Sequence, residues 1–585
     1  MSDVDDGSRS AVRADGPGMS VSGVVAALGI PSAILIAHTA WYGEWIEDDA
    51  GLTFAYARSL SEGWGPVIQP GASPVEGWSN PTWLALMTFG RLVGLFDHGT
   101  IFGLSDLVVF PKFVAVLCGV AMFGAMFVLA RAVSSRPVLV ASVAGSATAL
   151  VPSFVIWSTS GLENSLFALI VVSLATVLVR AAVGGRLGRR QVAILCGLLS
   201  AAAALTRPDG IVYVVAHPVV ALAFAGRLGN GSAGRGGSGS VGRSIGHGIA
   251  AFSLPVGLYG IWRLDTFGDW LPTTARAKQQ GLPTPLAVSR PGELVLYGGW
   301  LAFATLVVLL VLILRARSPQ RTAVVVLLVP LGLAVLAYAV LQPDWMGQYR
   351  FATPVWALSA LVGTLALEGV LDVAPDRRRR LILGGGIVVV LISLAGFARE
   401  AVAFRNDTTA PMCFVAQSVG QRIDAYADIL GVRGGSLLAV DGGGTALSSR
   451  MRFIDLSGLT DRRIAAAWHD GDAAGLKNYV FDEVRPTFIK SARAWGGAVA
   501  SGLLSDDRFQ RDYVVLFAPE PGSGTWVRRD AIIDPGRVAV TRQWAQQAYR
   551  AVEQRYLRPE AQTQWRCGPT LTPASPSPYP LPARG

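Results

Sequence analysis

The sequence has few charged residues for its length. Asp, Glu, Lys and Arg make up 15% of its 585 residues, whereas a soluble domain carries about 25%. Hydrophobic residues make up 51% of the chain, and the mean hydropathy is +0.44. This composition excludes an ordinary soluble protein and is typical of a protein embedded in a membrane.

Histidine and cysteine are also scarce, with five and four residues in the chain. No histidine has a partner at metal-ligand spacing and no Ser/His/Asp set emerges, so neither zinc binding nor triad hydrolysis is indicated. Cys118 and Cys196 lie within apolar runs and are expected to be inert core residues. Cys413 and Cys567 lie in the polar C-terminal part and can form a disulfide if that part faces an oxidising compartment.

The chain lacks a glycine-rich nucleotide motif. Asp441 precedes three glycines after a strand-like run, but the series is not GxGxxG, so a turn at a strand end is the simpler interpretation. The formal net charge of +10 would suit a nucleic-acid partner, yet the arginines lie between apolar runs rather than along one face. We therefore expect no nucleic-acid partner.

Long apolar runs are what the sequence has in abundance. They recur through the first 400 residues and are long enough to cross about 30 Å of hydrocarbon, which predicts about eleven transmembrane helices. Two of them, 191–206 and 211–226, are short. The predicted helices cover 21–40, 112–133, 137–156, 165–183, 191–206, 211–226, 245–264, 294–314, 322–341, 353–372 and 381–398.

Every second connection between these runs is rich in arginine. Arginine marks the cytoplasmic side of a membrane protein, so the pattern predicts a multi-pass plasma (inner) membrane protein with a cytoplasmic N-terminus. The first long loop and everything after Arg399 then lie outside the cytoplasm. The arginine-rich connections are at 131–136, 180–190, 227–243, 315–321 and 377–380.

Composition divides the chain into parts. Residues 1–20 are polar and expected to be disordered, and 21–399 form the membrane domain with a large first outer loop at 41–111. Residues 400–568 have the composition of a soluble, extracytoplasmic α/β domain. The Pro- and Ser-rich segment 569–585 is expected to be a disordered tail. The fold class is thus mainly α and polytopic, with a C-terminal α/β domain.

The outer connections carry acids and bases at one membrane level. Carboxylates beside hydrocarbon are costly to desolvate, so such a cluster needs a reason. An enzyme acting on a lipid-linked phosphate would hold the phosphate with Arg or Lys and use a carboxylate as base toward a hydroxyl. A transporter would use such groups as an ion pathway. The acids are Asp48, Asp49, Glu163, Asp209 and Asp344, and the bases are Arg207, Arg276, Lys278 and Arg350.

Several of these residues also have simple structural interpretations. Arg207 can pair with Asp209 across the intervening proline. Arg350 can anchor to lipid headgroups, and Lys278 can be a solvated lysine on an interfacial helix near 274–280. Glu163 can cap a neighbouring helix.

The run EDDAGLTFAYARSLSEGWGPVIQPGASPVEGWSNPTW, residues 47–83, resembles the first outer loop of the mycobacterial terminal (β-1,2) arabinofuranosyltransferase family, membrane glycosyltransferases of the GT-C class. The C-terminal region is shorter than in that family, and the spacing within DWMGQYRF differs slightly. Further matches follow in the same order: SGLEN at 160–164, TRPDG at 206–210, LPTTARAK at 271–278, DWMGQYRF at 344–351 and IDLSGLTD at 454–461.

The resemblance implies inverting transfer of arabinofuranose from decaprenyl-phosphoryl arabinofuranose to a cell-wall arabinan of the arabinogalactan or lipoarabinomannan type. The base would be Asp49 or Asp48; we favour Asp49, with Asp48 as its orienter or metal partner. No cofactor is certain, and a divalent cation, Mg²⁺ or Mn²⁺, is an option. Arg207, Lys278, Arg350 and Arg276 would hold the donor phosphate, and the substrate-binding residues would be Glu76, Trp78, Asn80, Glu163, Asp209 and Asp344.

Three alternatives stay open at the level of the sequence. Relatives with this loop pattern could move another polyprenyl-phosphate sugar onto a protein or glycan. A transporter of lipid-linked sugars would need no outer base. A non-catalytic cell-wall protein would bind glycan through the Trp- and Gly-rich loop. The family resemblance also implies that the C-terminal domain is similar to a carbohydrate-binding module.

Overall fold

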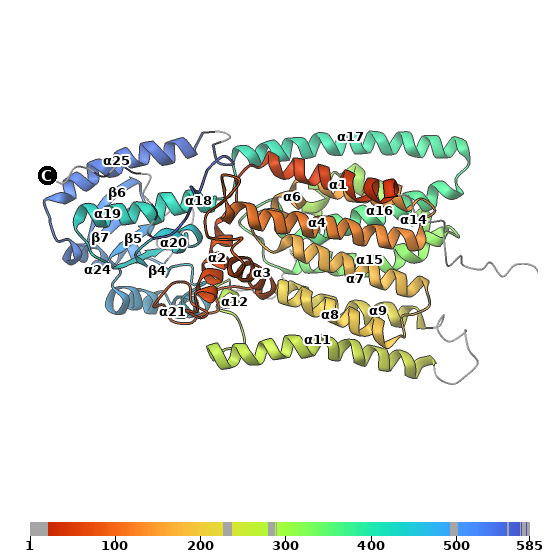
Figure 1. The fold of residues 1–585 in the computed structure, drawn as a ribbon, viewed down its shortest axis with the longest axis horizontal. Coiled ribbons are helices and arrows are strands. Elements are labelled where there is room, and N and C mark those ends of the chain that lie inside the picture. The colour runs from red at the N-terminus through yellow and green to blue at the C-terminus, as the bar shows by residue number, and fades with distance from the viewer. Residues whose placement is uncertain are drawn as a thin grey trace, which may run out of the picture.

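The protein consists of a bundle of long helices with a smaller, sheet-containing domain at one end (Figure 1). The computed structural model describes residues 21–225, 237–278, 287, 289–491, 501–558, 561–573, 575, 579 and 581. The expected cytoplasmic segment 1–20 and most of the Gly/Ser-rich connection near 227–243 lie outside the described residues.

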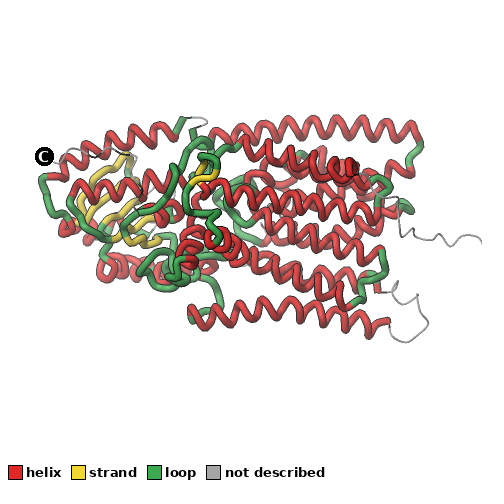
Figure 2. Tube along the Cα trace, in the orientation of Figure 1, coloured by secondary structure: helices red, strands yellow, loops and turns green. Residues whose placement is uncertain are grey.

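Each of the eleven predicted apolar runs contains a helix or a bent pair of helices. This confirms the mainly helical, polytopic architecture (Figure 2). The helices of the bundle are α1 (Val21–Trp41), α4 (Asp106–Val133), α5 (Pro137–Leu150), α6 (Pro152–Ser158), α7 (Asn164–Val183), α8 (Arg190–Thr206), α9 (Ala216–Ala223), α11 (Gly237–Phe267), α13 (Pro291–Gly298), α14 (Trp300–Arg315), α15 (Pro319–Val340), α16 (Thr353–Val373) and α17 (Asp376–Asn406).

The number of membrane spans is lower than predicted. Within the described part of the chain, seven helices are long and apolar enough to cross a membrane, or up to nine if two bent pairs each count as one span. The pairs α5–α6 and α13–α14 bend by 78° and 104°. Gly299 turns the second pair at a φ of +94°, which glycine adopts without steric cost. The two short runs become α8 and a short helical turn, Pro208–Val215, that leads into α9.

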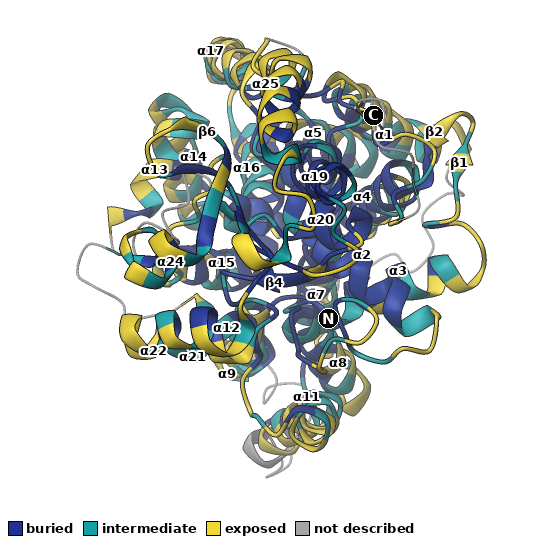
Figure 3. Cartoon of the chain, turned by 90° about the vertical axis from the view of Figure 1, so that its left-hand side faces the viewer, coloured by how far each residue is buried: buried dark blue, intermediate teal, exposed yellow. Residues whose placement is uncertain are grey.

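Burial distinguishes inner from outer helices. The apolar windows of α7 and α16 are mostly buried within the protein, whereas none of the window of α17 is. Figure 3 shows this as a buried centre surrounded by exposed helices, α17 and α11 among them. Long apolar helices without protein cover are stable only in hydrocarbon, so the chain is an integral membrane protein.

The first long loop is folded rather than extended. It contains α2 (Asp48–Ser61), α3 (Pro81–Leu92) and a two-stranded hairpin, β1 (Thr100–Ile101) with β2 (Leu104–Ser105). Its core is aromatic: Tyr56 and Trp83 are fully buried, and Trp78 is 3% exposed. Such burial supplies most of the stabilisation of a small folded unit.

The C-terminal domain is an α/β unit with a mixed sheet of strand order β4-β3-β5-β7-β6. Strands β3, β4 and β5 are parallel, and β7 pairs antiparallel with β5 and β6. The strands are β3 (Ser436–Ala439), β4 (Arg452–Asp455), β5 (Phe488–Ser491), β6 (Tyr513–Glu520) and β7 (Ser523–Arg528), and the helices include α18 (Met412–Val415), α19 (Arg422–Leu430), α20 (Gly443–Ser448), α21 (Arg462–Asp470), α22 (Ala473–Asn478), α24 (Asp507–Asp512) and α25 (Arg537–Tyr556).

Two boundaries differ from those expected. Helix α17 continues to Asn406, so it extends past the expected domain boundary at 400. In the segment expected to be a disordered tail, Leu571 is fully buried and Tyr579 is 4% exposed. The Leu571 carbonyl also accepts a hydrogen bond from Arg58, which joins this described residue to the first loop.

The C-terminal domain is attached directly to the first loop. The Arg58 guanidinium on α2 donates to the Leu447 carbonyl at 2.9 Å and forms a paired ion contact with Asp97. Helices α2 and α20 pack so closely that a Cβ on Gly51 would meet the Gly443 backbone at 2.6 Å. Cys413 and Cys567 form a disulfide within the domain, with Cα atoms 4.6 Å apart.

Candidate active site

A cavity of about 340 Å³ lies where the bundle meets the C-terminal domain. One wall consists of the start of α2, the end of a short helix α12 (Thr273–Ala277) and the segment 341–351; we call it the membrane-side wall. The other, the domain wall, consists of the loops after β3 and β4. The charged residues that line the cavity are Glu47, Asp48, Asp49, Lys278, Asp344, Arg350, Asp441 and Asp455.

Asp49 is the acid of this cavity best placed to react. It lies in the first turn of α2, where the Glu47 side chain caps the helix by accepting a hydrogen bond from the Asp49 N–H at 2.7 Å. No described residue donates a hydrogen bond to its carboxylate or pairs with it. Burial raises the pKa of Asp49, and the positive charges of Lys278 and Arg350 oppose this rise. An unpartnered carboxylate with a raised pKa is suited to accept a proton.

Asp48, the alternative base, is engaged elsewhere. Its two carboxylate oxygens accept hydrogen bonds from the backbone N–H groups of Gly443 and Gly444 at 3.2 and 2.7 Å. These groups begin α20, and a helix N-terminus favours an anion. Asp48 is 7% exposed, and its hydrogen bonds join α2 to the C-terminal domain. Of the two adjacent carboxylates, Asp49 is therefore the one to which no described residue donates a hydrogen bond.

Arg350 reaches the cavity from a backbone in an uncommon conformation. Gly347, Gln348 and Tyr349 all have positive φ, at 70°, 48° and 53°. Non-glycine residues adopt this region only when their surroundings impose it. Here the Gln348 carbonyl accepts hydrogen bonds from Ser153 Oγ at 2.6 Å and Trp157 Nε1 at 3.0 Å.

The conformation of this segment brings Arg350 next to Asp344. Its Nε lies 2.7 Å from the Asp344 carboxylate, and its guanidinium lies over the rings of Trp157 and Phe351. Both predicted residues therefore line the same cavity as Asp49. The Arg350 charge is partly neutralised by Asp344, so it is not a free cation.

Lys278 is the cation of the cavity that lacks an acidic partner among the described residues. It follows the last residue of α12, within the region where we expected an interfacial helix. Desolvation and the nearby Arg350 lower the pKa of Lys278. Arg276, predicted to hold phosphate as well, is not a cavity residue: it is largely exposed and pairs with Asp269 at 2.8 Å.

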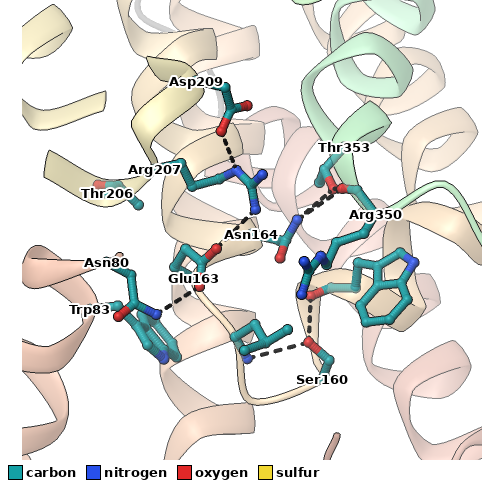
Figure 4. Close-up of polar contacts among 12 residues, drawn as sticks. Asn80, Trp83, Ser160, Glu163, Asn164, Thr206, Arg207, Asp209, Arg350 and Thr353 are labelled. Atoms are coloured by element: carbon teal, nitrogen blue, oxygen red, sulfur yellow. Dashed lines mark hydrogen bonds and ion pairs between the residues drawn. The ribbon is translucent and has the colours of Figure 1, made fainter. Parts of the chain in front are cut away.

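Arg207 is another predicted phosphate ligand that the structure places elsewhere (Figure 4). Its guanidinium donates to Glu163 and to Asp209, each at 2.9 Å, and the other oxygen of Glu163 accepts from Asn80 at 2.8 Å. The guanidinium also lies 4.7 Å from the centre of the Phe351 ring. The cluster is buried and its charges are paired internally, because an unpaired buried charge would be costly. Arg207, Glu163, Asp209 and Asn80 are thus not among the residues that line the cavity, and their contact with substrate stays a prediction.

Glu76 and Trp78, predicted to line an acceptor groove, are buried as well. The Glu76 carboxylate pairs with Arg263 on α11 at 2.6 Å and accepts from Tyr259 at 2.6 Å. The Trp78 indole donates to the same Tyr259 hydroxyl at 3.0 Å. Buried polar groups are satisfied by hydrogen bonds, and here those bonds fasten the first loop to α11. A Trp- and Gly-rich loop is also the composition of a compact aromatic core, and an acceptor groove at Glu76 and Trp78 stays a prediction.

The structure adds residues that sequence reasoning missed. Asp441 and Asp455 reach the cavity from the ends of β3 and β4. Asp455 is 1% exposed and fully occupied by the Ser457 and Thr460 backbone and side-chain donors. Asp441 has no such partners. The available signal was an acid at the end of a strand, since loops at the carboxyl edge of a parallel sheet commonly form sites.

The sequence left a divalent cation as an option. Among the described residues, no three His, Cys, Asp or Glu side chains lie close enough together to hold one. The reason lies in the individual acids. Asp48 is occupied by backbone N–H groups and Asp344 by Arg350, so neither adds to Asp49.

No family model and no curated protein matches the chain. Solved structures that resemble it include the apo oligosaccharyltransferase of Archaeoglobus fulgidus, with 13% identity and a TM-score of 0.49 over 82% of this chain and 71% of that one. ArnT from Cupriavidus metallidurans bound to undecaprenyl phosphate shows 14% identity and a TM-score of 0.47 over 79% and 80%. The arabinofuranosyltransferase AftD from mycobacteria shows 15% identity and a TM-score of 0.49 over 86% and 40%. At these values the resemblance does not identify an activity.

Proposed function

We propose that the protein is a membrane glycosyltransferase of the GT-C class that uses a polyprenyl-phosphate sugar as donor. In its specific form, the proposal is transfer of arabinofuranose from decaprenyl-phosphoryl arabinofuranose to a cell-wall arabinan, as the sequence resemblance implies. The observation that carries it is one cavity in which the free Asp49 carboxylate lies beside the cations Lys278 and Arg350.

The charge arrangement suits a phosphate leaving group. A polyprenyl phosphosugar is a phosphodiester with one negative charge. When the polyprenyl phosphate leaves as a monoester, it acquires a second negative charge. Lys278 and Arg350 would stabilise that developing charge, and such preorganised charges are effective in a site shielded from water. The cavity lies at the end of the bundle, where a lipid chain can remain between helices while its phosphate enters from the membrane side.

Asp49 would act as the general base in a single displacement. The acceptor hydroxyl oxygen attacks the anomeric carbon while the bond between this carbon and the phosphate oxygen breaks. The electron pair of the broken bond leaves with the polyprenyl phosphate, and the hydroxyl proton moves to the Asp49 carboxylate. One displacement inverts the configuration at the anomeric carbon, which is the outcome expected for a site with one base.

The arginine pattern of the connections supports an orientation for this reaction. The predicted cytoplasmic connections join helices at the end of the bundle away from the C-terminal domain, as for α16 and α17 in Figure 1. The proposal therefore places the cavity and the C-terminal domain outside the cytoplasm of the plasma membrane, where a cell-wall acceptor is available.

The test is sugar transfer by the purified protein in detergent, from synthetic polyprenyl-phosphoryl arabinofuranose to an arabinan oligosaccharide. Loss of a positioned base costs about 100- to 10,000-fold in rate, so Asp49→Asn is expected to reduce transfer by that factor. The matched control is Glu483→Gln, which changes an exposed acid that pairs with Arg463 and does not line the cavity.

Each outcome of this test has a clear meaning. Transfer by the wild type and by Glu483→Gln but not by Asp49→Asn supports the proposal. Undiminished turnover by Asp49→Asn would exclude it as the base. Transfer of another sugar from the same lipid carrier, but not of arabinofuranose, would retain the class and replace the donor. If the wild type binds the donor but transfers its sugar to none of the acceptors tested, a transporter of lipid-linked sugars would be favoured.

A further inference from the structure

The domain wall of the cavity is built at a topological switch point. In the strand order β4-β3-β5, the chain leaves β3 for β4 on one side, and β5 then enters on the other side of β3. Loops at such a point diverge and open a crevice at the carboxyl ends of the strands, where ligands of open α/β sheets bind. The loop after β3 lines the cavity with Val440, Asp441 and Gly442.

Asp441 is the unused acid of this wall. Its backbone carbonyl accepts a hydrogen bond from Thr445 at 2.6 Å, which holds the turn into α20. Its carboxylate accepts no hydrogen bond from any described residue, in contrast to Asp455 next to it in the wall. Burial raises the pKa of Asp441, and the positive charge of Lys490 on the neighbouring strand β5 opposes this rise.

The charges of the cavity are therefore distributed unevenly. Both cations of the lining, Lys278 and Arg350, belong to the membrane-side wall, which also carries four acids, whereas the charged residues of the domain wall are the acids Asp441 and Asp455. Among the lining residues, only the membrane-side wall therefore offers cations to a phosphate. A carboxylate that only accepts hydrogen bonds suits a ligand that donates them, and the hydroxyl groups of a sugar do so.

We infer that Asp441 binds hydroxyl groups of the acceptor sugar, so that the C-terminal domain forms the acceptor subsite of the cavity. This inference rests on the proposed function and assigns each wall a substrate: the donor phosphate to the membrane side and the acceptor saccharide to the domain side. Asp441 acts by placing the acceptor hydroxyl toward Asp49, which also lines the cavity and interacts electrostatically with Asp441.

The test compares steady-state kinetics of Asp441→Asn with the wild type, varying donor and acceptor separately. Hydrogen bonds to a charged group carry enough energy for about a tenfold to hundredfold change in affinity. We expect the KM for an arabinan oligosaccharide to rise by that factor while the KM for the polyprenyl-phosphate donor changes less than about twofold. Asp441→Glu is expected to recover part of the acceptor affinity, because it restores the carboxylate.

A rise in the donor KM instead, or a loss of kcat with unchanged acceptor KM, would overturn the assignment; the latter would make Asp441 a base. If Asp441→Asn lowers the unfolding temperature, Asp441→Ser provides a second variant that keeps the backbone carbonyl bonded by Thr445. Calorimetric binding of the oligosaccharide without donor separates this inference from the proposed function. Wild-type binding that Asp441→Asn abolishes supports the subsite even if no donor is turned over, whereas equal binding by both refutes it.

Discussion

At the scale of single residues, the cavity combines an acid whose pKa is raised and a base whose pKa is lowered. Burial raises the pKa of the Asp49 carboxylate, whereas desolvation within the cavity and the nearby Arg350 charge lower the pKa of the Lys278 ammonium. In the proposed reaction, Asp49 must be deprotonated to accept a proton, and Lys278 must be protonated to hold the phosphate.

The pH dependence of transfer follows from these two directions. Activity should fall as the pH drops through the raised pKa of Asp49, and it should also fall as the pH rises through the lowered pKa of Lys278. Arginine stays protonated above pH 12, so Lys278→Arg is expected to move the alkaline limb upward and leave the acidic limb in place. The measurement is kcat/KM from about pH 4 to 10.

An alkaline limb that does not move in Lys278→Arg would show that another group controls it. The conservative Arg276→Lys variant is the control, because this exposed residue pairs with Asp269 outside the cavity. It should leave both limbs unchanged.

At the scale of elements, the site depends on close packing of α2 against α20. A Cβ on Gly443 would lie 1.7 Å from the Asp48 carbonyl oxygen, a distance that no adjustment of a side chain can relieve. The same contact lets Asp48 accept hydrogen bonds from Gly443 and Gly444. The two walls of the cavity can therefore stay in contact partly because Gly443 has no side chain.

Gly443→Ala is expected to separate these helices and widen the cavity. Overpacking of a well-packed interior costs about 1–3 kcal/mol, and the backbone contact here places the variant at the upper end. We expect a lower unfolding temperature in detergent together with at least a tenfold loss of transfer. Gly384→Ala on α17, where a Cβ would meet no atom within 4 Å, is the control and should leave both quantities unchanged. Full activity of Gly443→Ala would show that the α2–α20 contact is not needed for the site.

At the scale of the whole molecule, the cavity exists only because two separately built parts meet. The loops at this end of the membrane bundle supply Asp49, Lys278 and Arg350, and the C-terminal domain supplies Asp441 and the helix N-terminus that holds Asp48. Neither part alone encloses the space, so the proposed reaction requires the domain on the same side as the first outer loop. The disulfide between Cys413 and Cys567 fits an oxidising compartment on that side.

This orientation can be measured with single introduced cysteines. Asp470→Cys places a thiol on the exposed end of α21 in the C-terminal domain, and Arg317→Cys places one in the connection between α14 and α15. A membrane-impermeant maleimide is expected to label only Asp470→Cys in intact cells and both variants after lysis. The native Cys118 and Cys196 are buried and give a low background. The reverse pattern in intact cells would place the C-terminal domain in the cytoplasm.

The sequence by itself determined the elements and their environment. Apolar runs the length of a bilayer form helices wherever they occur, so all eleven helical regions were predictable, as was the strand before Asp441. The sequence also singled out five of the charged cavity residues: Asp48, Asp49, Lys278, Asp344 and Arg350.

Tertiary structure alone decided which charged residues are free. Arg207, Glu163 and Asp209 are of the same residue types as the cavity residues and were predicted to lie at the same membrane level. In the structure they neutralise one another in a buried network. Adjacent carboxylates such as Asp48 and Asp49 are equivalent until a neighbouring helix N-terminus takes one of them. Asp441 became part of the site because the sheet brings the end of β3 to α2, a contact between residues nearly 400 positions apart that no local pattern encodes.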